Sequence, residues 1–129
     1  MTGERDFIGV AGGTGLRVLV VGAGRVGARV LRQLQKNPEL TVLVLDPREN
    51  PHALEEGIIS KVDIREALTP LTLEHVVAQA RPELILLTTT TEDLGLGKAP
   101  GLDVLVDSLK EEVAALSEVP VIEVARRGV

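Results

Sequence analysis

A short apolar strand that runs directly into a glycine-rich turn constrains this chain more than any other feature. The run Val18-Leu-Val-Val ends at Gly22, and Gly24 and Gly27 complete a Gly-x-Gly-x-x-Gly spacing ahead of an amphipathic segment. In such a turn the first glycine allows a tight bend, the second leaves room for a pyrophosphate, and the third lets a helix pack closely on the sheet. The N-terminus of that helix offers unpaired N–H groups and a partial positive charge to phosphates. The pattern is the dinucleotide-binding fingerprint.

An acidic residue normally accompanies this fingerprint, and here Asp46 closes a second apolar run at about the 20-residue interval expected. We expect its carboxylate to accept hydrogen bonds from both hydroxyls of an adenosine ribose. Because it would repel a 2′-phosphate, it favours NAD(H) over NADP(H); the alternative is a turn aspartate before Pro47. Arg48 is either a ligand for a 2′-phosphate, which would soften that preference, or a solvated loop charge.

Four further residues are candidates for binding the same ligand. Arg25 lies inside the glycine turn, where its guanidinium either folds over the pyrophosphate or stays on the surface. Asp63 follows a weak apolar segment and is either a partner for the adenine amino group or a loop acid. The threonine run that begins with Thr88 and Thr89 either contacts the second ribose and the phosphates or is simply good strand sequence.

Catalytic and metal-binding patterns are missing from the sequence. The two histidines, His52 and His75, have no carboxylate and nucleophile at the spacing of a hydrolytic triad. The chain contains no cysteine, and its scattered carboxylates form no recognisable ligand set for a metal. We therefore predict no catalytic residue and no metal site.

Strands and helices alternate along the chain. The expected strands cover residues 17–21, 41–45, 58–62 (weak), 84–88 and 120–125, and the expected helices cover 25–36, 51–56 (a short helix or turn), 71–80 and 103–116. Asp103 is expected to cap the last helix, whose inner face should carry Leu105, Leu109, Val113 and Leu116. The alternation predicts an α/β, Rossmann-like, doubly wound parallel sheet of about five strands in the order 3-2-1-4-5, with helices on both faces and ligand at the carboxyl ends.

The size and composition suit one domain of this kind. The chain has 129 residues, and we expect a flexible N-terminal arm over 1–15 and a single nucleotide-binding domain over 16–129. The glycine cluster at 11–15 is read as part of that arm rather than as a second phosphate loop. A net charge of −5 and a single aromatic residue, Phe7, argue against nucleic-acid binding. Without a signal peptide or a long apolar run, a cytoplasmic location is expected.

The residues quoted so far resemble the RCK/KTN family, the TrkA-N-type nucleotide-binding domains that regulate potassium channels and transporters. The resemblance covers about residues 17–125 and rests on the glycine turn with Arg25, on Asp46, on Val62-Asp63, and on the threonine-rich strand end followed by acids at 88–93. It implies NAD(H), ATP or ADP bound by the glycines, Arg25 and Val26, with Asp46 on the ribose. It also implies homodimers, a transporter or other partner subunit, and binding that changes conformation without turnover.

Three functions remain open on the sequence. The first is a nucleotide-sensing regulatory domain, favoured because a dehydrogenase usually places its acid–base residue in a second domain. The second is the NAD-binding module of a small oxidoreductase that acts with a partner chain. The third is an assembly subunit that a bound nucleotide only stabilises. Whether the chain is an enzyme therefore stays undecided, with the balance against it.

Overall fold

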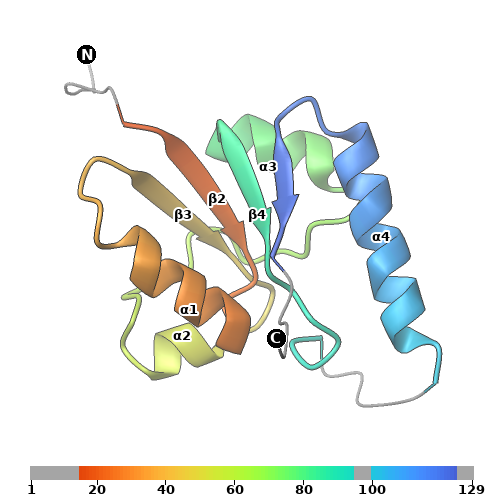
Figure 1. The fold of residues 1–129 in the computed structure, drawn as a ribbon, viewed down its shortest axis with the longest axis horizontal. Helices are drawn as coiled ribbons and strands as arrows, with labels where there is room; N and C mark the ends of the chain where they lie inside the picture. Colours follow the sequence, from red (N-terminus) through yellow and green to blue (C-terminus); the bar gives the residue numbers. More distant parts are fainter. Residues whose placement is uncertain (1–14, 95–99, 125–129) are drawn as a thin grey trace.

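The computed structural model of the chain describes residues 15–94 and 100–124, and the element labels used from here follow Figure 1. Four parallel strands form the sheet in the order β3-β2-β4-β5. They are β2 (Arg17–Val21), β3 (Thr41–Leu45), β4 (Leu84–Leu87) and β5 (Val121–Glu123). The central strand β2 pairs with β3 on one side and with β4 on the other, so the chain reverses its direction of progress across the sheet at β2.

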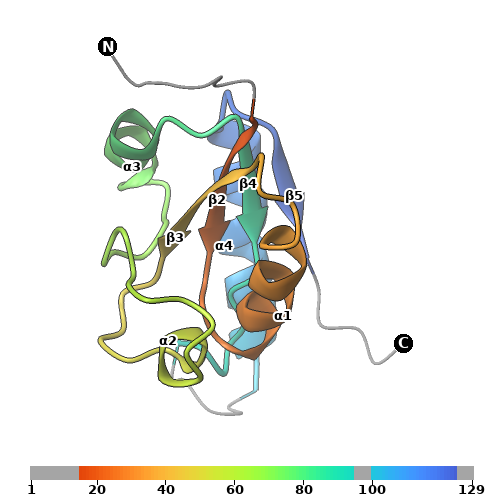
Figure 2. The same cartoon turned by 90° about the vertical axis from the view of Figure 1, so that its left-hand side faces the viewer.

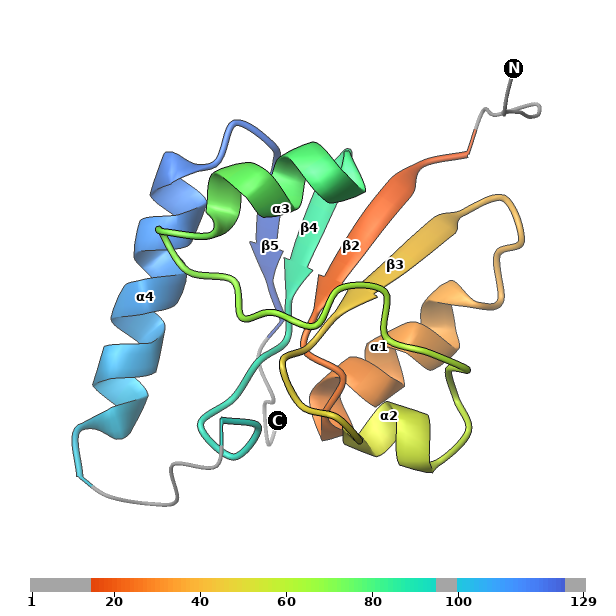
Figure 3. The same ribbon diagram turned by 180° about the vertical axis from the view of Figure 1, so that it is seen from behind.

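Helices cover both faces of this sheet. They are α1 (Arg25–Leu34), α2 (His52–Glu55), α3 (Leu73–Ala80) and α4 (Leu102–Leu116). Seen edge-on, α1 lies on one side of the sheet and α3 on the other (Figure 2). From behind, α3 and α4 both lie on the face opposite α1, with α4 beside β5 (Figure 3). The predicted α/β class with a parallel sheet is confirmed, whereas five strands in the order 3-2-1-4-5 are not.

Successive side chains of the central strand β2 pack into two separate apolar cores, one on each face of the sheet, as expected for a strand buried on both faces. Val18 and Val20 point to the α1 side, where they pack with Leu31 of the helix. Leu19 and Val21 point to the other side and pack with α3 residues such as Val76. Both cores consist of aliphatic side chains, which is why the chain needs almost no aromatic residues.

The expected third strand at 58–62 was wrong. Gly57, with a φ of +74°, ends α2, and the Ile58 N–H donates to the carbonyl of Ala53, so Ile58 and Ile59 pack against the α1 core. The chain reaches the edge of β3 only afterwards, in a single bridge between Leu45 and Ile64. Ile58 and Ile59, which the sequence pattern assigned to a strand, therefore follow the end of α2 and pack against the core instead of joining the sheet.

The last helix is also rotated relative to expectation. Val113 is buried as expected, and the other buried position is Val106, seven residues earlier, whereas Leu105 and Leu116 are 52% and 56% exposed. Lys110 lies on the inner side and makes an ion pair with Glu123 of β5 at 3.4 Å. The leucines and the valines are equally apolar, so helical spacing alone could not determine which of the two rows packs on the sheet.

Smaller differences concern the ends of elements. The structure ends α1 at Leu34 rather than at residue 36 and begins α3 at Leu73 rather than at 71. It ends β4 at Leu87 and places Gly101 rather than Asp103 at the N-cap of α4. The last strand covers Val121–Glu123 of the expected 120–125, and residue 125 lies outside the described residues. Residues 1–14 of the expected arm lie outside the described residues. No helix in the described parts of the chain is both long and apolar enough to cross a bilayer.

Asp63, which follows the segment expected to form the third strand, makes hydrogen bonds to the edge of β3. Its carboxylate accepts a hydrogen bond from the Val44 N–H at 2.8 Å, and its own N–H donates to the Val44 carbonyl at 2.9 Å. Asp63→Ala should lower the free energy of unfolding by about 1–2 kcal/mol, because the Val44 N–H loses a charged acceptor. Lys61→Ala is the matched control: it removes only the exposed partner of the same carboxylate, 3.7 Å away, and should change stability by less than about 0.5 kcal/mol. Equal losses in chemical denaturation would contradict this role.

Candidate functional site

The glycine turn holds β2 and α1 at a separation that side chains would prevent. Gly22 has a φ of +103°, and a Cβ there would lie 2.8 Å from the hydroxyl oxygens of Thr88 and Thr89. A Cβ on Gly27 would overlap the carbonyl oxygen of Gly22. Both positions therefore require glycine, one for its backbone conformation and one for the close approach of helix and strand.

The N-terminus of α1 projects from this turn without a side-chain cap. Gly24 is the N-cap residue and makes no capping hydrogen bond, so the first helical amides have no acceptor within the helix. Val26 is buried, whereas the side chain of Arg25, the first residue of α1, is exposed. The first turn contains no acidic residue. A helix end of this kind attracts an anion, because its amides and its dipole both favour negative charge.

Asp46 lies beside the glycine turn, but its carboxylate is occupied by protein donors. It is 1% exposed, and Oδ2 accepts from the Ala23 N–H at 2.8 Å and from Arg48 Nη2 at 2.7 Å. Oδ1 accepts from the N–H and the Nε of Arg48, at 2.9 and 3.0 Å. A carboxylate offers about four acceptor positions, so these bonds use them all. A ribose could bind here only after Arg48 moved away.

The environment of Asp46 keeps it ionised. Burial by itself would raise its pKa, but the hydrogen bonds from Arg48 and from the Ala23 N–H, together with the Arg48 charge, outweigh that effect. The pKa of Asp46 is therefore below its ordinary value. The same bond, as the largest contribution, raises the pKa of Arg48. Arg65 holds the loop from the other side, donating to the carbonyls of Arg48 and Glu49.

Two of the predicted ligand-binding residues make hydrogen bonds within the fold. Thr88 is fully buried, and its hydroxyl interacts with the carbonyl oxygens of Val21 and Gly22 at 2.9 and 2.8 Å. It therefore ties β4 to the glycine turn. Asp63 lies on the edge of β3, as described above, and its carboxylate is used by Val44. Thr89 is half-buried, and its hydroxyl lies 3.3 Å from the Val21 carbonyl oxygen.

Asp93 is the residue at this site that the sequence analysis did not single out as a ligand contact. It is 6% exposed and lies directly over Gly24, with Oδ1 3.9 Å from Arg48 Nη2. Burial raises its pKa; the Asp46 charge adds to that rise, and the Thr90 N–H and the Arg48 charge only partly offset it. The one signal in the sequence was an acid soon after the threonine-rich strand end.

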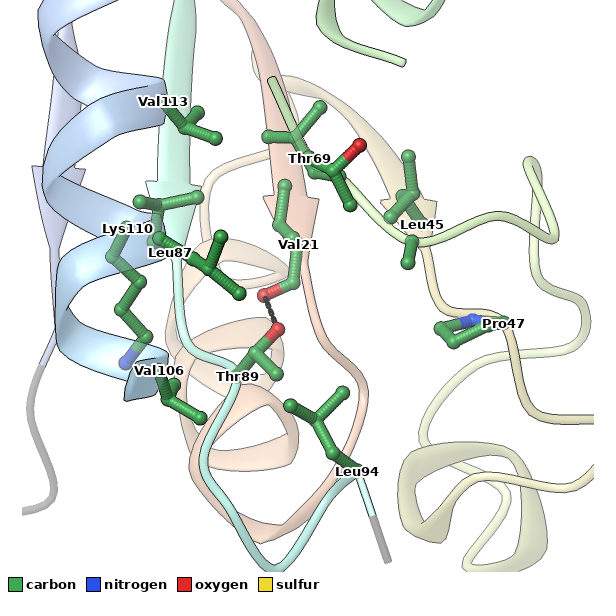
Figure 4. A pocket seen from close by; sticks show the side chains of 13 residues that line it. Val21, Leu45, Pro47, Thr69, Leu87, Thr89, Leu94, Val106, Lys110 and Val113 are labelled. Carbon is green, nitrogen blue, oxygen red and sulfur yellow. Dashed lines mark hydrogen bonds between the residues drawn. The ribbon is translucent and has the colours of Figure 1, made fainter. Parts of the chain in front are cut away.

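An apolar cavity of about 110 Å³ adjoins these residues at the carboxyl ends of the strands (Figure 4). The last residue of each of three strands lines it, namely Val21, Leu45 and Leu87. Val106 and Lys110 of α4 close one side, and Pro47, next to Asp46, lies on the other. The walls are suited to a flat apolar group, with the hydroxyls of Thr69 and Thr89 and the Lys110 ammonium as their polar elements.

Other comparisons add no constraint on this site. Within the described residues, no group of three or more histidine, aspartate or glutamate side chains is placed to hold a metal ion. A comparison of the sequence with protein-family models finds no match, and a search of curated proteins finds no significant relative. The interpretation of the site therefore rests on its geometry.

Asp46→Asn should be strongly destabilising at neutral pH. It leaves the buried Ala23 N–H and the partly exposed Arg48 guanidinium facing an amide, and the loss of these charge-assisted hydrogen bonds should cost about 1–3 kcal/mol. Because the folded pKa of Asp46 is depressed, its stabilisation is present above the unfolded value of 3.8 and is lost as the pH falls through the folded pKa. The melting temperatures of the wild type and Asp46→Asn should therefore differ widely at pH 7, and the difference should narrow below pH 3.8. A difference that does not change with pH would refute the ion-pair role.

Asp93→Asn should have the opposite effect and raise the melting temperature at pH 7. The raised pKa means that folding disfavours the ionised carboxylate, whereas an amide of the same shape can still accept from the Thr90 N–H. As the pH falls and Asp93 takes up a proton, the wild type should become more stable relative to the variant, and the difference in melting temperature should shrink. Asp107→Asn, on the exposed side of α4, is the control and should leave the melting temperature unchanged. A lower melting temperature for Asp93→Asn at pH 7 would contradict this assignment.

Proposed function

We propose that this chain binds an adenine nucleotide, NAD(H) or ATP/ADP, and acts as a regulatory domain of the RCK/KTN type. The observation that carries the proposal is the uncapped N-terminus of α1 behind a turn whose Gly22 and Gly27 cannot be replaced without strain or overlap. A turn so constrained brings backbone amides close to a ligand phosphate. Binding is expected at the carboxyl ends of the strands, where the direction of progress across the sheet reverses.

The cavity supports the adenine part of the proposal. It lies at the same end of the sheet as the glycine turn, and its walls are mainly aliphatic side chains from three strands, α4 and the 67–69 loop. Phosphates at α1 and a base in the cavity would together span the ends of β2, β3 and β4. NAD(H) is the first choice of ligand because Asp46 follows the glycine turn at the interval of a ribose-binding acid, and a ribose would bind it once Arg48 moves away.

A regulatory role is proposed because the groups around the cavity are suited to binding. Thr69, Thr89 and Lys110 are its polar side chains, and Lys110 is already paired with Glu123. Pairing of two copies would suit such a role, since α4 and the edge strand β5 carry exposed apolar side chains. These are Val104, Leu105, Leu109, Leu116 and Ile122. A transporter or other partner subunit would then respond to the nucleotide state of the pair.

A thermal-shift panel tests the ligand class. NAD, NADH, NADP, ATP, ADP and AMP are each added to the purified chain, and unfolding is followed with an extrinsic dye because the chain has no tryptophan or tyrosine. A nucleotide at a hundredfold excess over its dissociation constant should stabilise the fold by about 2.7 kcal/mol. We expect shifts for NAD(H) or ATP/ADP, with no change in the redox state of the cofactor over hours. Turnover of the cofactor would instead favour an oxidoreductase module.

A pair of arginine variants locates the phosphates in that panel. Arg25→Ala should weaken binding about fivefold, roughly 1 kcal/mol for a partly exposed charge contact. Arg29→Ala removes an equally exposed arginine one turn farther along α1 and should have little effect. Equal affinities for both variants would place the phosphates elsewhere, and the absence of any nucleotide shift would overturn the proposal.

A further inference from the structure

The carboxylate of Asp93 occupies the space that a nucleotide phosphate would need. A Cβ built on Gly24 would overlap this carboxylate, with Oδ2 2.8 Å away. The carboxylate therefore fills the gap left by the missing side chain of the second glycine. In the fingerprint, that gap is what lets a pyrophosphate approach the backbone. Asp93 and a diphosphate cannot both lie over Gly24.

Short-range bonds hold Asp93 in this position. Its Oδ2 accepts from the Thr90 N–H at 3.1 Å, and its own N–H donates to the Thr90 hydroxyl at 3.2 Å. Outside this turn, its carboxylate makes an ion pair with Arg48 at 3.9 Å. The turn follows β4 directly, and the next residue, Leu94, lines the apolar cavity. A movement of the 90–93 turn would therefore clear the α1 N-terminus and change the cavity wall together.

The carboxylate of Asp93 also opposes a ligand phosphate by its charge. Asp46 uses all of its acceptor positions on protein donors, so Arg48, which Asp93 shares at 3.9 Å, is already committed to Asp46. Arg25, next to Gly24, is the exposed cation that could receive a phosphate. An incoming diphosphate would meet the Asp93 carboxylate at close range for as long as Asp93 stays ionised and in place. Neither carboxylate is among the residues that line the apolar cavity.

We propose that Asp93 determines which adenine compounds this site accepts, by competing with ligand phosphates for the N-terminus of α1. Adenosine enters the cavity with Asp93 in place. A diphosphate binds only when the 90–93 turn moves outward, so its affinity is reduced by the work of displacing the turn. The inference rests on the proposed nucleotide site and adds the residue that sets its selectivity.

Calorimetric titration of two ligands against matched variants tests this inference. Adenosine and ADP are titrated at one pH and salt concentration into the wild type, Asp93→Ala, Asp93→Asn and the control Asp107→Asn. We expect Asp93→Ala to bind ADP at least tenfold more tightly and adenosine within twofold of wild type. Asp93→Asn, which removes the charge and keeps the volume, should gain less for ADP. Asp107→Asn should match the wild type for both ligands.

The outcomes separate this inference from the proposed function. Suppose that the wild type binds both ligands and that the Asp93 variants leave the ratio of ADP affinity to adenosine affinity unchanged, or lower it. The inference is then wrong and the nucleotide site stands. If no variant binds either ligand, both are overturned. Should Asp93→Ala fail to fold, Thr90→Val, which removes the hydroxyl that accepts from the Asp93 N–H, must raise the ADP-to-adenosine ratio in the same direction.

Discussion

The close approach of α1 to the end of β2 is the constraint on which the rest of this structure depends. Gly27 lies against the carbonyl of Gly22, and Gly22 itself adopts a conformation that favours glycine. That contact directs the helix N-terminus toward the carboxyl end of the sheet. It also brings the Ala23 N–H within reach of Asp46 on the neighbouring strand. The anion-attracting helix end and the acidic cluster are therefore consequences of the same packing.

Two buried carboxylates lie beside one arginine at this end of the sheet, and their environments shift their pKa values in opposite directions. Asp46 receives four hydrogen bonds and has a lowered pKa, whereas Asp93 is buried with fewer donors and has a raised one. The first arrangement stabilises the fold, and the second works against it. A buried acid that folding disfavours is more typical of binding sites than of structural cores. This contrast directs attention to Asp93 as a determinant of what the site accepts.

The failures of sequence reasoning have a common physical cause. Ile58 and Ile59 have the composition of a strand, yet they pack over α2 because Gly57 ends that helix and turns the chain inward. In α4, Val113 packs on the sheet as expected, but Val106 is buried there and the expected Leu105 and Leu116 are exposed. In both cases the local sequence pattern correctly identified the residues as apolar, but it did not identify the surface against which they pack. Which surface they bury against was settled by neighbours distant in sequence.

The amino-acid sequence by itself determined the glycine turn, the bounds of β2 and β3, the parallel α/β architecture and the position of Asp46 beside the turn. Those features follow from local periodicity and from backbone conformations that few residues can adopt. The tertiary structure alone decided that Arg48 saturates Asp46, that Thr88 ties β4 to the turn, and that Asp93 lies over Gly24. Most of these contacts join segments tens of residues apart, and the sheet order brings them together. Spacing along the chain carries no record of such proximity.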